Sequence, residues 1–130
     1  MKKITSITIL SLIISFSLSA QKVTDSRSIR QNIIGHKYED VNKKVVDQYG
    51  NKCSPYIWFQ DYNPMMDGEV ALTNLVKPKP GTNGGIYTIS STGKITVTGA
   101  NGSTICFYLL TDGRIETTYN GEKIYLKQVE

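Results

Sequence analysis

The second half of the chain alternates between hydrophobic and polar residues, in runs that are separated by short glycine-containing turns. These runs, rich in β-branched residues, cover residues 86–90, 94–98, 103–111, 114–119 and 122–128. Two of the turns contain Asp112-Gly113 and Asn120-Gly121. Such pairs suit two-residue hairpins because both central positions need a positive φ. The pattern therefore predicts a C-terminal five-stranded antiparallel meander.

The same alternation separates two faces of the meander, because successive side chains of a strand point to opposite sides. The hydrophobic face comprises Ile95, Val97, Ile105, Phe107, Leu109, Ile115, Thr117, Tyr119, Ile124 and Leu126. The opposite face is largely polar, but Cys106, Tyr108 and Leu110 are apolar on it. We expect the first face to form the core, and the strand at 103–111 to be covered on both sides.

The first half of the chain is less regular. Short strands are predicted at 33–38, 44–49, 56–60 and 69–76. Residues 24–32 indicate a loose tail or a short helix capped by Thr24 or Asp25, and residues 77–85 indicate a loop because they contain two prolines and three glycines. Closing eight or nine strands into a barrel removes exposed edges. The predicted fold class is therefore all-β, a single-domain antiparallel up-and-down barrel of about eight strands.

The N-terminal twenty residues have the pattern of an export signal. Lys2 and Lys3 precede an apolar run, and small residues follow it up to Ala20. The run is shorter than the roughly 20 apolar residues of a spanning helix, so a retained anchor is the less favoured alternative. We expect cleavage near Ala20 and a bacterial protein in the periplasm or outside the cell, with no membrane span in the mature form. The expected organisation is a signal peptide at 1–20, a tail or short helix at 21–32, and a β-barrel domain at 33–130.

The charge of the mature chain excludes one class of partner. Loss of Lys2 and Lys3 lowers the 15 basic residues to 13, against 11 acidic ones, so the net charge falls from +4 to +2. The remaining basic residues are scattered, whereas nucleic-acid binding needs a clustered basic stripe. We therefore expect no nucleic-acid partner.

Two cysteines, Cys53 and Cys106, remain after removal of the signal. In an oxidising compartment an even cysteine count favours a disulfide, which the chain-entropy model values at roughly 4 kcal/mol for a loop of this length. The alternative is two buried free thiols. We expect the Cys53–Cys106 disulfide, and no zinc site, because a cysteine pair with a single histidine supplies too few ligands.

The layout also resembles that of the small bacterial secreted lipocalin-like (calycin) domains. The similar segments are Ile34-Gly35-His36-Lys37-Tyr38, the stretch from Gly85 to Val97, and Asn120 to Leu126. The family's Gly-x-Trp is absent, since His36, Lys37 and Tyr38 follow Gly35, and Trp58 lies in a different predicted strand. The resemblance implies an eight-stranded barrel that is open at one end, in a family known for binding rather than catalysis.

The side chains available for chemistry are few. His36 is the single histidine, and no nucleophile motif accompanies it, so we expect no catalytic residues and no enzyme activity. The stretch from Asp61 to Glu69 carries several oxygen ligands and could be a calcium loop. Its spacing does not fit an EF-hand, so an ordinary turn is favoured, with neither a metal nor a cofactor.

Aromatic and methionine residues supply the candidates for binding. Tyrosine is a common strand residue, but those in turn-rich segments also suit contact surfaces. The expected partner surface comprises Tyr56, Tyr62, Met65 and Met66. A small apolar ligand inside the barrel would contact Trp58, Phe107, Tyr119 and Leu126. The sequence thus predicts a non-catalytic binding protein that holds a small apolar ligand or presents loops to a partner; the alternative is an inhibitor or immunity protein for an exported hydrolase in the cell envelope.

Overall fold

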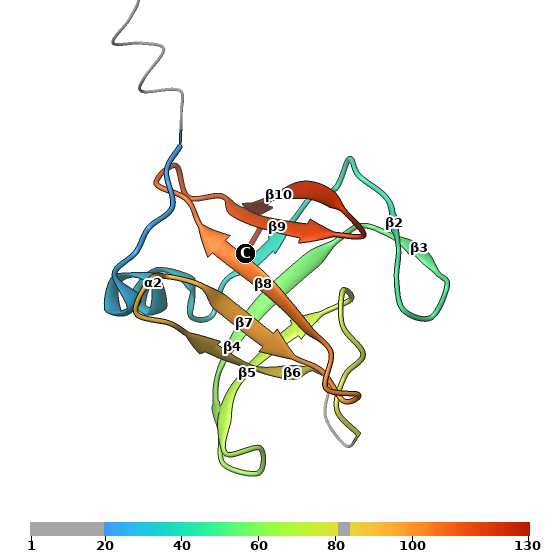
Figure 1. Ribbon diagram of the computed structural model, residues 1–130, viewed down its shortest axis with the longest axis horizontal. Helices are drawn as coiled ribbons and strands as arrows, with labels where there is room; N and C mark the ends of the chain where they lie inside the picture. Colours follow the sequence, from blue (N-terminus) through green and yellow to red (C-terminus); the bar gives the residue numbers. More distant parts are fainter. Residues whose placement is uncertain (1–19, 81–83) are drawn as a thin grey trace, which may run out of the picture.

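The computed structural model describes residues 20–80 and 84–130, and this part of the chain forms a closed eight-stranded antiparallel barrel (Figure 1). Around the barrel the strand order is β1-β10-β9-β8-β7-β6-β5-β4. The strands are β1 (Lys37–Glu39), β4 (Tyr56–Asn63), β5 (Gly68–Thr73), β6 (Gly85–Ile89), β7 (Ile95–Thr98), β8 (Thr104–Leu109), β9 (Ile115–Tyr119) and β10 (Glu122–Gln128). The prediction of an all-β, eight-stranded barrel is confirmed.

Strands β6 to β10 form the predicted meander, in which every neighbour along the chain is also the neighbour in the sheet. Val97 pairs with Ile105, and Phe107 pairs with Thr117, so residues of the hydrophobic face lie opposite one another. Position 93, in the turn between β6 and β7, requires glycine, because its φ is +92° and a Cβ there would lie 2.3 Å from the carbonyl oxygen of Val23. The turns therefore bring the hydrophobic residues of successive strands into register.

A short helix, α2 (Ser26–Ile33), precedes the first barrel strand. Asp25 caps it by accepting a hydrogen bond from the backbone N–H of Ser28. Ile33 belongs to this helix and not to the strand predicted from that position, because Ile29 and Ile33 are one helical turn apart and both enter the core. The strand begins only at Lys37, after Gly35 has turned the chain with φ +77°.

The strand predicted at 44–49 lies outside the barrel. Strand β2 (Val45–Val46) pairs only with β3 (Lys52–Cys53), and the two form a separate small sheet. In Figure 1 this hairpin projects on the opposite side of the barrel from α2. Its turn is held by Asp47, whose Oδ1 accepts hydrogen bonds from the backbone N–H groups of Tyr49 and Asn51.

Side chains fill the barrel interior, and the core extends over both of its ends. Phe59 is fully buried, with its ring centroid 6.0 Å from that of Tyr38 and 5.2 Å from that of Tyr87, both in edge-on geometry. At one end, Ile29 and Ile33 of α2 join the core cluster. At the other end, the core is completed by Val45, Leu75 and Val76.

The predicted Cys53–Cys106 disulfide is wrong, because both cysteines are free. Cys106 lies in the middle of β8 with its side chain on the outer wall, where β7 and β9 are its neighbours. Cys53 lies in the β2–β3 hairpin, where its sulfur accepts a hydrogen bond of 3.1 Å from Nδ2 of Asn74. Compartment and cysteine count favour a bridge, but the structure places Cys53 in the separate β2–β3 sheet and Cys106 on the barrel wall. Further along the outer face of β8, Lys22 lies over the Tyr108 ring.

Two buried core tyrosines predict a loss of stability in alkali. Burial raises the pKa of Tyr38 to about 12, and burial together with Glu69 raises the pKa of Tyr87. Because the folded pKa exceeds the unfolded value of about 10, their contribution to stability is complete below pH 10 and is lost as the pH rises towards 12. We expect urea unfolding, followed by circular dichroism, to show this fall, and Tyr38→Phe to reduce it. Tyr49→Phe, at an exposed position, is the control, and an identical pH profile in both variants would contradict the assignment.

Candidate functional site

The hairpin that connects β4 and β5 projects beyond the barrel and forms the tip seen at the lower edge of Figure 1. The pairing of the two strands shifts register between Phe59 and Tyr62, as in a β-bulge, which bends a strand and increases its twist. Beyond this irregularity Tyr62 pairs with Glu69, and Asn63 pairs with Gly68. The tip therefore leaves the curvature of the barrel wall and extends into solvent.

Hydrogen bonds within the tip fix its shape. The backbone N–H of Met65 donates to Oδ1 of Asn63 at 3.0 Å, and that of Met66 donates to the carbonyl oxygen of Asn63 at 3.1 Å. Asp67 adopts φ +51°, a left-handed conformation in which Asp and Asn are enriched. Its Oδ1 accepts a 2.7 Å hydrogen bond from the hydroxyl of Tyr62, which raises the pKa of that tyrosine. The exposed side chains are thus carried on an ordered turn.

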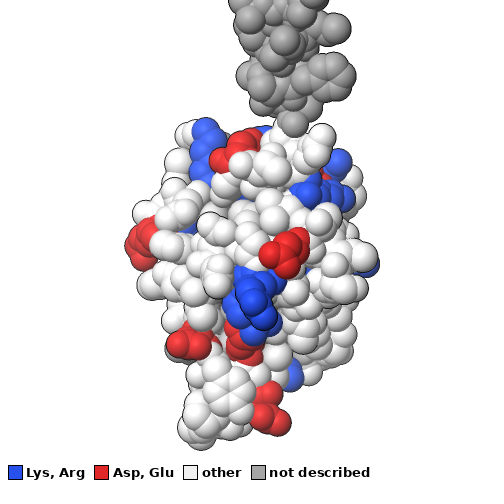
Figure 2. Space-filling model, turned by 90° about the vertical axis from the view of Figure 1, so that its left-hand side faces the viewer, with Lys and Arg blue, Asp and Glu red and all other residues white. Residues whose placement is uncertain are grey.

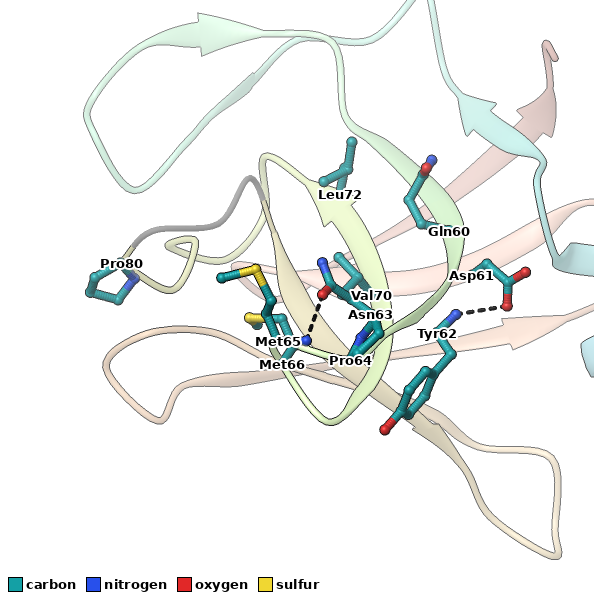
Figure 3. Close-up of a pocket in the computed structure, with 10 residues that line it drawn as sticks. All are labelled: Gln60, Asp61, Tyr62, Asn63, Pro64, Met65, Met66, Val70, Leu72 and Pro80. Atoms are coloured by element: carbon teal, nitrogen blue, oxygen red, sulfur yellow. Dashed lines mark hydrogen bonds between the residues drawn. The ribbon is translucent and has the colours of Figure 1, made fainter.

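A surface hollow of about 790 Å³ lies beside the tip, on the outer wall of β4 and β5. It is lined by Gln60, Asp61, Tyr62, Asn63, Pro64, Met65, Met66, Val70, Leu72 and Pro80 (Figure 3). In Figure 3, Met65 and Met66 lie on the side of the hairpin that faces Pro80, whereas the ring of Tyr62 points away. Met65 is 95% exposed and Tyr62 is 53% exposed. The site therefore combines a hollow with a mixed polar and apolar lining and an aromatic ring on its far side.

The tip carries negative charge. Asp61 and Asp67 are exposed and flank Tyr62, and within the described residues neither forms an ion pair. Asp61 accepts a 2.7 Å hydrogen bond from the backbone N–H of Tyr62. Glu69 lies in β5, on the barrel side of the tip, and its charge is paired: it forms an ion pair with Arg30 of α2 and accepts a hydrogen bond from Tyr87. The unpaired charge is thus confined to the exposed end of the hairpin.

The structure brings together three of the four residues predicted for a partner surface. Tyr62, Met65 and Met66 all line the tip and its hollow. Tyr56 lies at the opposite end of β4, half-buried, where the ammonium group of Lys37 is 5.2 Å from its ring centroid. Tyr56 therefore belongs to the outer wall of the barrel and not to the tip.

The four residues predicted to contact an interior ligand do not share one space. Phe107 and Leu126 are fully buried in the packed core. Tyr119 is half-buried near the end of β9, and its hydroxyl donates to the carbonyl oxygen of Val46 at 3.0 Å. Trp58 points outward from β4, between its register partners Lys37 and Leu72. Side chains therefore occupy the positions where a ligand was expected, and one of the four lies outside.

The titratable side chains of the described residues are mostly used in structural contacts. His36 Nδ1 lies 3.0 Å from the carbonyl oxygen of Glu130 and 3.1 Å from Nε2 of Gln128, so it joins the start of β1 to the C-terminus. In the part of the chain that is described, no three His, Cys, Asp or Glu side chains are grouped so that they could hold a metal ion. None of the helices described there is both long and apolar enough to cross a membrane.

Sequence reasoning missed part of the hollow and a second exposed apolar region. Val70 and Leu72 alternate with the inward residues Ala71 and Thr73, so period two in β5 could have placed them on the outer wall. No local pattern indicates that Pro80 lies beside them, since this depends on the course of the loop. The second region consists of Val41, Val46 and Tyr49, which are exposed around the β2–β3 hairpin.

Comparisons with protein families, with curated proteins and with solved structures found no match for this chain. The function of this chain is therefore inferred from the geometry and the charges of the site itself.

Proposed function

We propose that this chain is an exported, non-catalytic binding protein that presents a surface loop to a protein partner. The observation that carries the proposal is the contrast between a solid interior and an exposed hairpin. Phe59, Phe107 and Leu126 are completely buried inside the barrel, whereas Met65 is 95% exposed at the tip. An eight-stranded barrel is just wide enough to be filled by side chains or to hold one small ligand. Because side chains fill the interior, binding of a partner on the outer surface is better supported than transport of a ligand inside the barrel.

An inhibitor or immunity role belongs to the same class of function. A projecting, internally hydrogen-bonded hairpin loses little conformational freedom on binding, and such preorganisation favours affinity. The β4–β5 tip has this property because Asn63 and Asp67 fix its turn through side-chain hydrogen bonds. The non-catalytic part of the proposal is supported by His36, whose ring contacts the C-terminal segment and not a nucleophile.

Export remains part of the proposal. The predicted signal lies outside the described residues except for Ala20. Directly after it, the backbone N–H of Gln21 donates to Oγ1 of Thr111 at 3.1 Å, and the backbone N–H of Thr111 donates to the carbonyl oxygen of Gln21 at 2.8 Å. Cleavage after Ala20 would keep this segment on the barrel. Intact-mass analysis of the protein from the cell exterior or periplasm is expected to give a chain that starts at Gln21, and the full-length mass would contradict export with cleavage.

Two measurements test the binding proposal. Native mass spectrometry of the protein purified from its host under mild conditions is expected to show no co-purified apolar ligand. Size-exclusion chromatography of envelope extracts is expected to show a stoichiometric protein complex that is lost in a Tyr62→Ser/Met65→Ser variant. Both positions are exposed, so these substitutions should change the free energy of unfolding by less than about 0.5 kcal/mol each. A tightly bound lipid, or a complex unaffected by the variant, would count against the proposal.

A further inference from the structure

Tyrosine rings paired with a carboxylate and a cation recur on the surface of this barrel. In three places a Lys or Arg lies over a tyrosine ring and also within ion-pair distance of an acidic side chain. Lys22 lies 3.9 Å from the ring centroid of Tyr108 and 3.9 Å from a carboxylate oxygen of Glu116. Lys37 lies 5.2 Å from the ring centroid of Tyr56 and 3.7 Å from a carboxylate oxygen of Glu39. Arg114 lies 4.7 Å from the ring centroid of Tyr125 and 2.7 Å from a carboxylate oxygen of Asp112.

The β4–β5 tip has the ring and the carboxylates of such a set without the cation. The Tyr62 hydroxyl is hydrogen-bonded to Asp67, and Asp61 precedes the tyrosine in the chain. No Lys or Arg of residues 20–80 and 84–130 forms an ion pair with either carboxylate. In Figure 2 the projecting lower end of the molecule, which is the β4–β5 tip, shows red acidic side chains beside white ones, and a blue basic side chain is visible just above them. The tip is thus an acidic, aromatic surface on a chain whose net charge is positive.

From this arrangement we infer that the tip recognises a protein segment that carries a Lys or Arg next to a large apolar residue. The inference rests on the proposed function and names the chemistry of its partner. The cation would lie over the ring of Tyr62 and between the two carboxylates, where both the ring quadrupole and the negative charge attract it. At Tyr56, Tyr108 and Tyr125 the chain's own Lys or Arg supplies the cation. At Tyr62 the partner would supply it.

The apolar part of the segment would occupy the hollow beside the tip. Its volume of about 790 Å³ is within the usual range of binding pockets, about 300–1,000 Å³. Met65 and Met66 line it together with Val70 and Leu72. Methionine is flexible and polarizable, so it adapts to apolar side chains of different shape. The hollow thus supplies contact area, while the charges at the tip select the partner.

The charge of the tip selects among classes of macromolecule. Nucleic acids and anionic membranes carry negative charge and would be repelled by Asp61 and Asp67. A protein segment that bears Lys or Arg has the complementary charge, which accelerates association and disfavours acidic competitors. A cationic peptide is therefore the simplest probe of the site.

The experiment is a selection of random 12-residue peptides displayed on phage against the full exported protein. Enriched sequences are expected to contain Lys or Arg near Leu, Ile, Phe or Met. The affinity of the best synthetic peptide, measured by fluorescence anisotropy, should fall roughly tenfold in Asp61→Asn/Asp67→Asn and should become less dependent on salt. Asn preserves the accepting oxygen at both positions and tolerates the positive φ of residue 67. Met65→Ala should weaken binding by about tenfold.

Asp40→Asn is the matched control. Asp40 also accepts a local backbone hydrogen bond, from Asn42, but it follows β1 at the opposite end of the barrel. Its replacement should leave peptide affinity within about twofold of the wild type. Enrichment of neutral or acidic peptides that still depend on Met65 would overturn the cationic partner and leave the proposed function standing. Peptides insensitive to all tip substitutions, or no enriched peptides, would overturn the assignment of the tip as the binding surface.

Discussion

Replacing Phe59 by alanine is expected to lower the free energy of unfolding by about 3–5 kcal/mol, as large-to-small substitutions of buried phenylalanine do. The ring is fully buried and makes edge-on contacts with Tyr38 and Tyr87. It therefore connects β1, β4 and β6 across the interior. Its removal leaves a cavity that strands closed into a barrel cannot easily collapse to fill.

Urea unfolding followed by circular dichroism measures this effect, with Tyr49→Ala as the control. Tyr49 is 58% exposed in the turn between β2 and β3, so its loss should change stability by less than about 0.5 kcal/mol. A Phe59→Ala protein as stable as the control would mean that the interior is loosely packed. The barrel would then have room for a ligand after all.

Introducing a charge under the helix is expected to have an effect of similar size. Ile29 is completely buried where α2 covers one end of the barrel. In an Ile29→Asp variant the carboxylate must be buried without a partner, or the helix must leave the barrel. Either outcome should lower the free energy of unfolding by about 3 kcal/mol or more. If the helix leaves, the exposed core should also bind the dye ANS.

Gln31→Asp introduces the same side chain on the exposed face of the same helix. It should cost less than about 1 kcal/mol, since a charge near a helix C-terminus has only a small unfavourable interaction with the helix dipole. Equal stability of Ile29→Asp and Gln31→Asp would show that α2 is not part of the cooperative fold. The difference between the two variants therefore measures how firmly the helix closes the barrel.

The proposed site and the core impose different demands on the same hairpin. Ile57 and Phe59 of β4 point inward and are fully buried, whereas Tyr62, at the far end of this strand, lies in solvent. The shift in register between Phe59 and Tyr62 allows both, because it ends the regular curvature of the wall where the tip begins. Substitutions at the tip are therefore expected to affect binding without affecting stability.

The candidate site was accessible to sequence reasoning only in part. Tyr62, Met65 and Met66 could be predicted because they lie within a few residues of one another in a turn-rich segment. Their grouping in space with Leu72 and Pro80 could not, since it depends on how β5 and the following loop pass beside the tip. The missing cation is also only partly visible in the sequence: Lys37 and Arg114 pair with carboxylates two residues away, but Lys22 pairs with the distant Glu116, so the local sequence does not show which tyrosines gain a cation.

The sequence by itself determined the meander and the composition of the core. Period two and glycine-containing turns are local properties, so residues such as Val97, Phe107 and Leu126 could be assigned to one buried face. Only the tertiary structure decided that Cys53 and Cys106 remain apart, that Ile33 ends a helix and that Trp58 faces outward. These features depend on which strands become neighbours when β1 closes the barrel between β4 and β10. That choice is made by long-range packing, and the residues nearby in sequence carry no signal of it.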